Sequence, residues 1–183
     1  MIGDEYIPIL LRFVSQQSGF AFFGACDFGC AHFLFLGDFM VITFCGHSQY
    51  TETKEDEQKI ISFLTETVGD RPAELFLGGY GSFDEFARKC GKIYQKTHPD
   101  VKLIFVTPYI SANLQKDLYD AIIYPELEKV PPKFAISHRN KWMVEQADYV
   151  IAHINHAWGG AYQTYKHAKR KNKRLLNLTG KEF

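Results

Sequence analysis

A glycine-rich turn followed by two acidic residues has the clearest chemical potential in this sequence. The apolar run Leu75-Phe76-Leu77 leads into Gly78-Gly79-Tyr80-Gly81-Ser82, and Asp84 and Glu85 follow. This order predicts a short strand, a tight turn and a helix, and Ser82-x-x-Glu85 is a capping-box pattern for a helix beginning near Phe83. Free N–H groups at a helix end attract phosphate, and glycine lets a ligand approach the backbone. The stretch therefore predicts an anion site that includes Gly78, Gly79, Gly81, Ser82 and Asp84.

Two other interpretations of this stretch stay open. The turn could bind nothing, with Glu85 serving only as a helix cap. Alternatively, a carboxylate of Asp84 or Glu85 could face a pocket and act catalytically, by activating water or stabilising a positively charged sugar.

Arg139 stands on the apolar side of a helix expected at 134–146. The residues three and four positions away are all apolar: Ala135, Ile136, Trp142 and Met143. A buried guanidinium is costly unless it is paired. We therefore expect Arg139 to pair with Asp84, with Glu85 or with a bound phosphate. The alternative is a side chain that reaches solvent from the edge of the stripe.

Strands that alternate with helices must position these side chains. Apolar runs predict strands at 40–45, 75–77, 102–107, 121–124, 148–154 and 174–178. Helices are expected at 55–68, 83–96, 134–146 and 161–171, with a short one near 112–119. The alternation is typical of an α/β fold, here a single Rossmann-like domain with a mainly parallel sheet and helices on both faces.

Such sheets bind ligands beyond the carboxyl ends of their strands. Four turns leave those ends, and two of them contain Gly-Gly directly before a helix, which favours an anionic ligand. Beyond the first turn, the candidate ligand-binding residues are Gly46, His47, Thr107, Asn155, Gly159, Gly160 and Ala161. The dinucleotide pattern G-x-G-x-x-G is absent, so no NAD or FAD cofactor is predicted.

The overall charge gives no sign of a nucleic-acid partner. The 183 residues suffice for one domain with a sizeable core, and 21 Lys and Arg balance 21 Asp and Glu. The basic run at 166–174 fits a solvated face at a helix C-terminus, and no aromatic residues alternate with it as in many nucleic-acid sites. Nucleic-acid binding is therefore not expected.

Residues 1–39 differ from the rest of the chain. They contain 8 of the 16 Phe and one basic residue against four acidic ones. The codons for Leu36-Gly37-Asp38-Phe39 can resemble a bacterial ribosome-binding site directly ahead of Met40. We hypothesise that Met40 is the native start, that 1–39 is translated upstream sequence, and that 40–183 is the domain. The intact mass of the native protein tests this hypothesis.

The same segment gives no targeting or metal signal. Asp4 and Glu5 stand where a secretion signal needs positive charge, so a cytoplasmic protein is expected. Charged and polar residues interrupt its apolar run, so a membrane helix is not predicted. Cys26, Cys30 and His32 have no second ligand pair, and no metal site is predicted.

From Met40 onward the sequence resembles the SLOG superfamily of Rossmann-like proteins, and most of all its YpsA-like bacterial and phage members. Four stretches carry the resemblance: Phe44-Cys45-Gly46-His47-Ser48, Gly78–Asp84, His138–Met143 and Ala147–Ala152 leading to Gly159-Gly160. The superfamily includes the Lonely guy (LOG) phosphoribohydrolases and the DNA-processing protein DprA. The resemblance therefore implies a nucleotide-derived ligand, and pairing of subunits in LOG proteins makes a homodimer one arrangement to expect.

The resemblance to LOG enzymes is incomplete at the catalytic residues. Those enzymes cleave an N-glycosidic bond with an arginine, which Arg139 matches, and with a glutamate after a later glycine turn. Here that later turn reads Trp158-Gly159-Gly160-Ala161-Tyr162-Gln163-Thr164-Tyr165-Lys166 and has no carboxylate. The leading hypothesis is thus a protein that binds or senses a nucleotide-like phosphate compound. A nucleoside-phosphate N-glycosidase using Arg139 with Glu85 or Asp84 is second, and single-stranded DNA binding is third.

Overall fold

The computed structural model of the chain describes residues 40–109, 116–125 and 127–183. Within these residues six parallel strands form one sheet in the order β4-β3-β2-β1-β5-β6. The strands are β1 (Met40–Gly46), β2 (Ala73–Leu77), β3 (Val101–Val106), β4 (Ala121–Ile123), β5 (Tyr149–His153) and β6 (Arg174–Asn177). The helices are α1 (Lys54–Thr67), α2 (Ser82–Gln95), α3 (Pro132–Gln146) and α4 (Gly159–Arg170), with a short 3-10 helix η1 (Lys116–Leu118).

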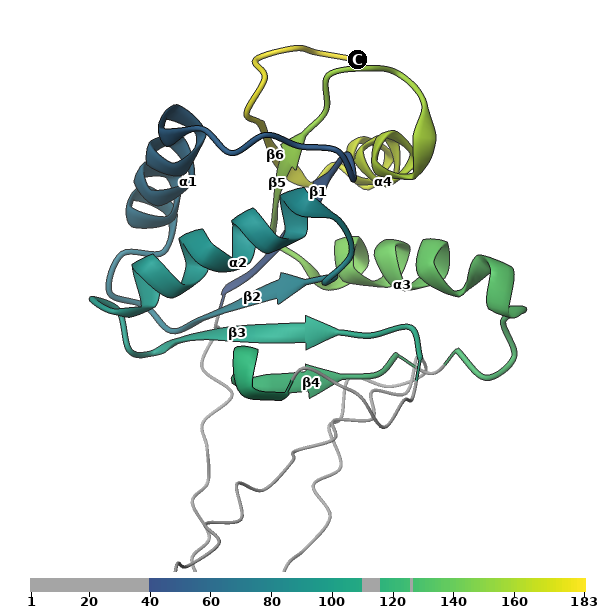
Figure 1. The fold of residues 1–183 in the computed structure, drawn as a ribbon, viewed down its shortest axis with the longest axis horizontal. Helices are drawn as coiled ribbons and strands as arrows, with labels where there is room; N and C mark the ends of the chain where they lie inside the picture. Colours follow the sequence, from purple (N-terminus) through teal and green to yellow (C-terminus); the bar gives the residue numbers. More distant parts are fainter. Residues whose placement is uncertain (1–39, 110–115, 126) are drawn as a thin grey trace, which may run out of the picture.

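The helices cover both faces of the sheet (Figure 1). Ile60 of α1 and Phe83 of α2 pack in one apolar core with the strand residues that point to their side, such as Leu75. On the opposite face Trp142 of α3 packs against Phe76, and α4 closes a third cluster of buried residues. Alternate residues of the central strands β1, β2, β3 and β5 thus enter opposite cores, as expected for a sheet covered on both sides.

The predicted fold class is confirmed. Each strand and long helix expected from the sequence is present, with ends that differ by a few residues at most. The short helix expected near 112–119 corresponds in part to η1, whereas 110–115 and the whole of 1–39 lie outside the described residues. Among the described residues, no helix combines the length and apolar character needed to cross a membrane.

The predicted capping box of α2 was wrong. The helix begins at Ser82 after Gly81, and no side chain caps its first turn. Instead the Ser82 hydroxyl donates to the Ser48 carbonyl at 2.8 Å and accepts from the Tyr50 N–H at 2.7 Å. Ser82 therefore joins the start of α2 to the segment after β1, a contact between distant stretches that local spacing does not encode.

Candidate functional site

A pocket of about 700 Å³ lies at the carboxyl edge of the sheet. Its walls come from the segments after β1, β2 and β5, together with α3 and the first turn of α4. The chain leaves β1 toward β2 on one side and leaves β5 toward β6 on the other, so β1 and β5 flank the switch point of the strand order. Open α/β sheets bind ligands in the crevice at this point.

The pocket gathers most of the predicted ligand-binding residues. Those that line it are Gly46, His47, Gly78, Asp84, Arg139, Asn155, Gly159, Gly160 and Ala161. Gly79, Gly81 and Ser82 belong to the same turn as Gly78 but do not line the pocket.

Two predicted residues face elsewhere. Thr107 was expected at the pocket rim, but its buried hydroxyl bonds to the N–H and carbonyl of Tyr109. Glu85 is exposed, and its carboxylate lies 3.9 Å from the ammonium of Lys89 on the next turn of α2. Neither residue lines the pocket, which leaves Asp84 as the acidic member of the predicted pair that does.

Arg139 is buried, with 2% of its surface exposed. Its Nη1 donates to the Gly78 carbonyl at 2.7 Å and to the Val106 carbonyl at 2.8 Å, which fixes the guanidinium between the ends of β2 and β3. Among the described residues, the buried Nε has no hydrogen-bond partner and Nη2 donates to none. The sequence-based expectation of a buried arginine is confirmed, but two carbonyls hold it rather than a directly paired carboxylate.

Gly78 is the residue that makes room for this guanidinium. A Cβ at Gly78 would lie 2.5 Å from Nη1 of Arg139 and 2.9 Å from Cζ. We expect Gly78→Ala to lower the free energy of unfolding by about 1–3 kcal/mol because the rigidly held side chain must move. Urea unfolding measures this.

Gly160→Ala is the matched control, since a Cβ at that position would meet no described atom within 4 Å apart from its chain neighbours and the backbone of its own helix. This control should be as stable as the wild type or slightly more stable, because alanine favours helix. Equal stability of Gly78→Ala and the wild type would contradict the proposed steric role of Gly78.

Asp84 brings a carboxylate into the same pocket. Burial raises its pKa to about 6, whereas the hydrogen bond from the Tyr80 N–H and the charge of Arg139 act in the opposite direction. The bond from Tyr80 N–H to Oδ2 is 2.8 Å long. A carboxylate with a pKa of about 6 can both release and take up a proton near neutral pH, as a general acid or base must.

Three stacked rings form another wall of the pocket. The imidazoles of His47 and His156 lie 3.5 Å apart between centroids, and His156 stacks on Trp158 at 3.9 Å. Burial lowers the pKa of His47, and the neighbouring His156 and His153 lower it further. The inner ring, His47, is buried, whereas Trp158 is 69% exposed.

The N-terminus of α4 opens on the pocket directly after these rings. Trp158 is its N-cap residue and makes no side-chain capping bond. Gly159 has a φ of +87°, a conformation that glycine adopts without strain. Gly159, Gly160 and Ala161 thus present the first turn of a helix, whose N–H groups have no partner within the helix.

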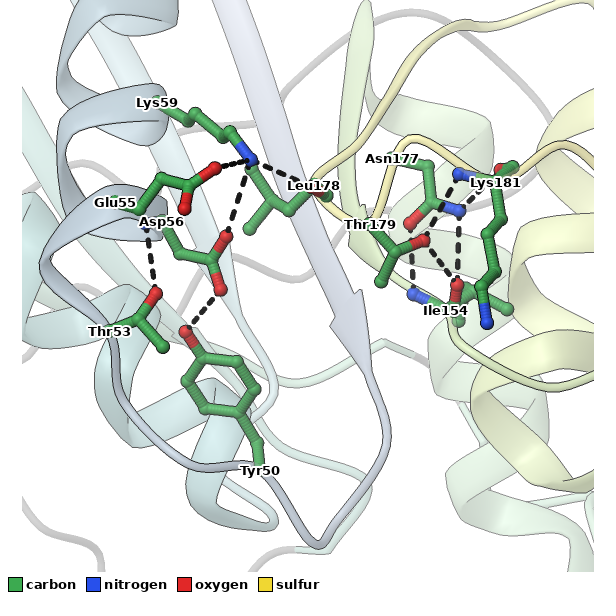
Figure 2. A network of polar contacts seen from close by, with 10 residues as sticks. All are labelled: Tyr50, Thr53, Glu55, Asp56, Lys59, Ile154, Asn177, Leu178, Thr179 and Lys181. Carbon is green, nitrogen blue, oxygen red and sulfur yellow. Dashed lines mark hydrogen bonds and ion pairs between the residues drawn. The ribbon is translucent and has the colours of Figure 1, made fainter.

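Polar contacts outside the pocket hold the segment after β1. The Tyr50 hydroxyl donates to Asp56 at 2.8 Å, and Lys59, 4.0 Å from Asp56, donates to the carbonyl of Leu178 at 3.3 Å (Figure 2). These contacts tie the loop that carries His47 to α1 and to the end of β6.

A second group of contacts holds the segment after β5. Figure 2 shows Ile154 joined to both Asn177 and Thr179: its N–H donates to the Asn177 side chain at 2.9 Å, and its carbonyl accepts from the Thr179 hydroxyl at 2.7 Å. Because Ile154 directly precedes Asn155, these bonds fix the backbone from which the pocket-lining turn starts.

Sequence reasoning missed His156, Trp158 and Tyr80 as members of the site. His156 and Trp158 lie between the predicted ligand-binding residues Asn155 and Gly159, so the position of those residues was the available signal. Their stacking with His47 depends on strand order, because β1 and β5 are neighbours in the sheet but far apart in sequence.

Two solved structures of DNA processing protein A share this arrangement of strands and helices. DNA processing protein A from Helicobacter pylori, described as having a unique single-stranded DNA binding mode, is 20% identical with a TM-score of 0.52 over 74% of this chain and 63% of its own. DNA processing protein A (DprA) from Streptococcus pneumoniae is 16% identical with a TM-score of 0.52 over 75% of this chain and 49% of its own. The molybdenum cofactor binding protein from Rippkaea orientalis is 17% identical with a TM-score of 0.49, covering 75% of this chain and 74% of that one. No protein-family model and no curated protein matches this sequence.

The likeness to the two DprA structures concerns the fold, because their sequence identity to this chain is 20% or less. The match spans less than two thirds of the length of either DprA chain. The likeness therefore agrees with the predicted Rossmann-like fold.

Proposed function

We propose that the pocket binds a nucleotide or a nucleotide-derived phosphate compound and that the protein acts as a binder or sensor of it. The observation that carries this proposal is the state of Arg139. Its described partners are two carbonyls and the ring of Tyr80, whose centroid lies 5.3 Å from Cζ, and burial lowers the pKa of the guanidinium. The charge of Asp84 raises the pKa of Arg139, but no direct ion pair joins the two among the described residues. A phosphate at the pocket would supply the missing acceptor oxygens.

The first turn of α4 supports an anion at the same place. Its N–H groups carry the positive end of the helix dipole, and no side chain caps them. Gly160 leaves open space beside this backbone. A phosphate could therefore approach the N–H groups of Gly159, Gly160 and Ala161 while it contacts Arg139.

Calorimetric titration with nucleoside monophosphates tests this proposal. The wild type should bind at least one of them, and Gly160→Ala should bind about tenfold more weakly, because its methyl group occupies the approach to the N–H groups. The variant's unchanged stability separates this effect from unfolding. Absence of binding to every nucleoside monophosphate, in a folded wild-type protein, would refute the proposal.

An N-glycosidase is the second candidate, and Asp84 is the observation that favours it. This carboxylate shares the pocket with Arg139 and has a pKa of about 6, which suits a proton carrier near neutral pH. Glu85 does not line the pocket, so the enzyme hypothesis now depends on Asp84. Incubation with nucleoside monophosphates followed by an assay for free base distinguishes the enzyme from the binder.

Single-stranded DNA remains the third candidate. A structural neighbour is described as binding it, and the fold gives no reason to exclude nucleic acid. A DNA-binding role predicts an affinity that falls steeply with salt, since several phosphates would be contacted at once. A single mononucleotide in the pocket should show a much weaker salt dependence.

A further inference from the structure

The stacked rings of His47, His156 and Trp158 form a platform with one free end. The planes of His47 and His156 differ by 27°, and those of His156 and Trp158 by 16°, so the three rings lie almost parallel. His47 is buried, and the Ile154 contacts hold the backbone that leads into the turn after β5, so the inner end of the platform is anchored to the sheet. Its outer ring, Trp158, is the exposed member.

Large apolar side chains gather around the mouth of this pocket. The described residues include six such side chains on the surface: Tyr80, Ile93, Tyr109, Phe134, Ile136 and Trp158. Three of them, Tyr80, Ile136 and Trp158, line the pocket, and they come from three different elements. Exposed apolar groups that converge on one cavity from separate elements indicate a ligand with an apolar surface of its own.

We propose that Trp158 is the stacking surface for the ring of the ligand, and that the ligand is a nucleoside monophosphate rather than a sugar phosphate or inorganic phosphate. This inference rests on the proposed phosphate site. Trp158 immediately precedes the first turn of α4, so a base on its ring lies next to N–H groups that can donate hydrogen bonds to the phosphate. Aromatic stacking accepts any base, because every base has a π face.

Binding by base-free and base-containing ligands tests the inference. The adenosine, guanosine, cytidine and uridine monophosphates are compared with ribose 5-phosphate and inorganic phosphate by calorimetry. At least one mononucleotide should bind tenfold or more tightly than ribose 5-phosphate. Trp158→Ala should weaken the binding of that mononucleotide by about 5- to 150-fold and leave the affinity for ribose 5-phosphate unchanged.

Two further variants separate stacking from a general disturbance of the surface. Trp158→Phe keeps a ring and should retain most of the affinity. Phe134→Ala removes another exposed aromatic side chain, one that does not line the pocket, and should bind like the wild type.

Tryptophan fluorescence locates the ligand directly. The chain has two tryptophans, and Trp142 is buried against Phe76 with ring centroids 5.8 Å apart. Acrylamide should therefore quench mainly Trp158, and a bound mononucleotide should protect it whereas ribose 5-phosphate should not.

The possible failures are distinguishable. Equal affinity for mononucleotides and ribose 5-phosphate, with no effect of Trp158→Ala, would overturn the stacking role and leave the phosphate site standing. A wild type that binds none of these compounds would overturn both.

Discussion

Replacing Arg139 with methionine should abolish detectable binding of nucleoside monophosphates at concentrations that saturate the wild type. Loss of one partner from a buried charged contact weakens binding by about 2–5 kcal/mol, which is about 30-fold to several thousand-fold. Arg139 is suited to such a contact because Gly78 and Val106 fix Nη1, and Nη2 donates to no described residue. Titration calorimetry of the folded variant measures the change.

The same substitution has opposing effects on stability. It leaves the carbonyls of Gly78 and Val106 without their donor, at about 1–3 kcal/mol for each buried group. It also removes a buried cation, which favours the fold. The net change in the free energy of unfolding should therefore be smaller than the loss of binding, and circular dichroism should show a folded variant.

Arg139→Lys is the control that separates charge from geometry. Lysine keeps the positive charge but has no planar fork of donors. It should bind phosphate ligands more weakly than arginine and more tightly than methionine. Wild-type affinity in the methionine variant would remove Arg139 from the site.

The fold was predictable because its signals are local. Apolar runs such as Met40–Cys45 and proline breaks such as Asp70-Arg71-Pro72 mark the elements within a few residues. Their alternation then fixes a parallel sheet, and its carboxyl edge becomes the expected site. Arg139 could be found in the same way, since its apolar neighbours follow helical spacing.

The pairing of side chains across the sheet was not predictable. Ser82 has the spacing of a helix cap, yet its hydroxyl bonds to the segment after β1. Thr107 follows β3 at the carboxyl edge of the sheet, where a ligand-binding residue was expected, yet its hydroxyl forms hydrogen bonds with the backbone of Tyr109. The ring stack joins His47 to His156 because β1 and β5 are adjacent. Each case depends on strand order or local backbone geometry, which residue spacing alone does not specify.

Asp84→Asn should stabilise the protein at neutral pH. The folded-state pKa of about 6 exceeds the ordinary value of 3.8 because burial disfavours the charged form. The stabilising contribution of this group is therefore fully present below pH 4 and is lost as the pH rises through 6. Asparagine stays neutral and keeps an acceptor for the Tyr80 N–H. The gain should be about 1–3 kcal/mol at pH 7.5 and close to zero at pH 4.

Urea unfolding at the two pH values measures this difference. A variant that is less stable than the wild type at pH 7.5, or whose effect is equal at both pH values, would contradict the assignment of a destabilising carboxylate. Glu85→Gln is the matched control, because Glu85 lies on the same turn of α2 but is exposed beside Lys89. It should change stability little at either pH, since exposed ion pairs contribute little.

Asp84→Asn also distinguishes the two leading functions, because an ionised Asp84 would weaken phosphate binding in a binding protein but would take part in the reaction of an N-glycosidase. In a binding protein the carboxylate repels the phosphate that Arg139 attracts, so Asp84→Asn should leave mononucleotide affinity unchanged or raise it several-fold. In an N-glycosidase the carboxylate takes part in the chemistry, and its loss should slow release of free base by about 100- to 10,000-fold. A stable variant that binds more tightly while the wild type releases no base supports the binder. If the wild type releases free base and Asp84→Asn binds the mononucleotide but releases none, the result supports the enzyme. The stability lost by burying the Asp84 carboxylate would then be explained by its catalytic role.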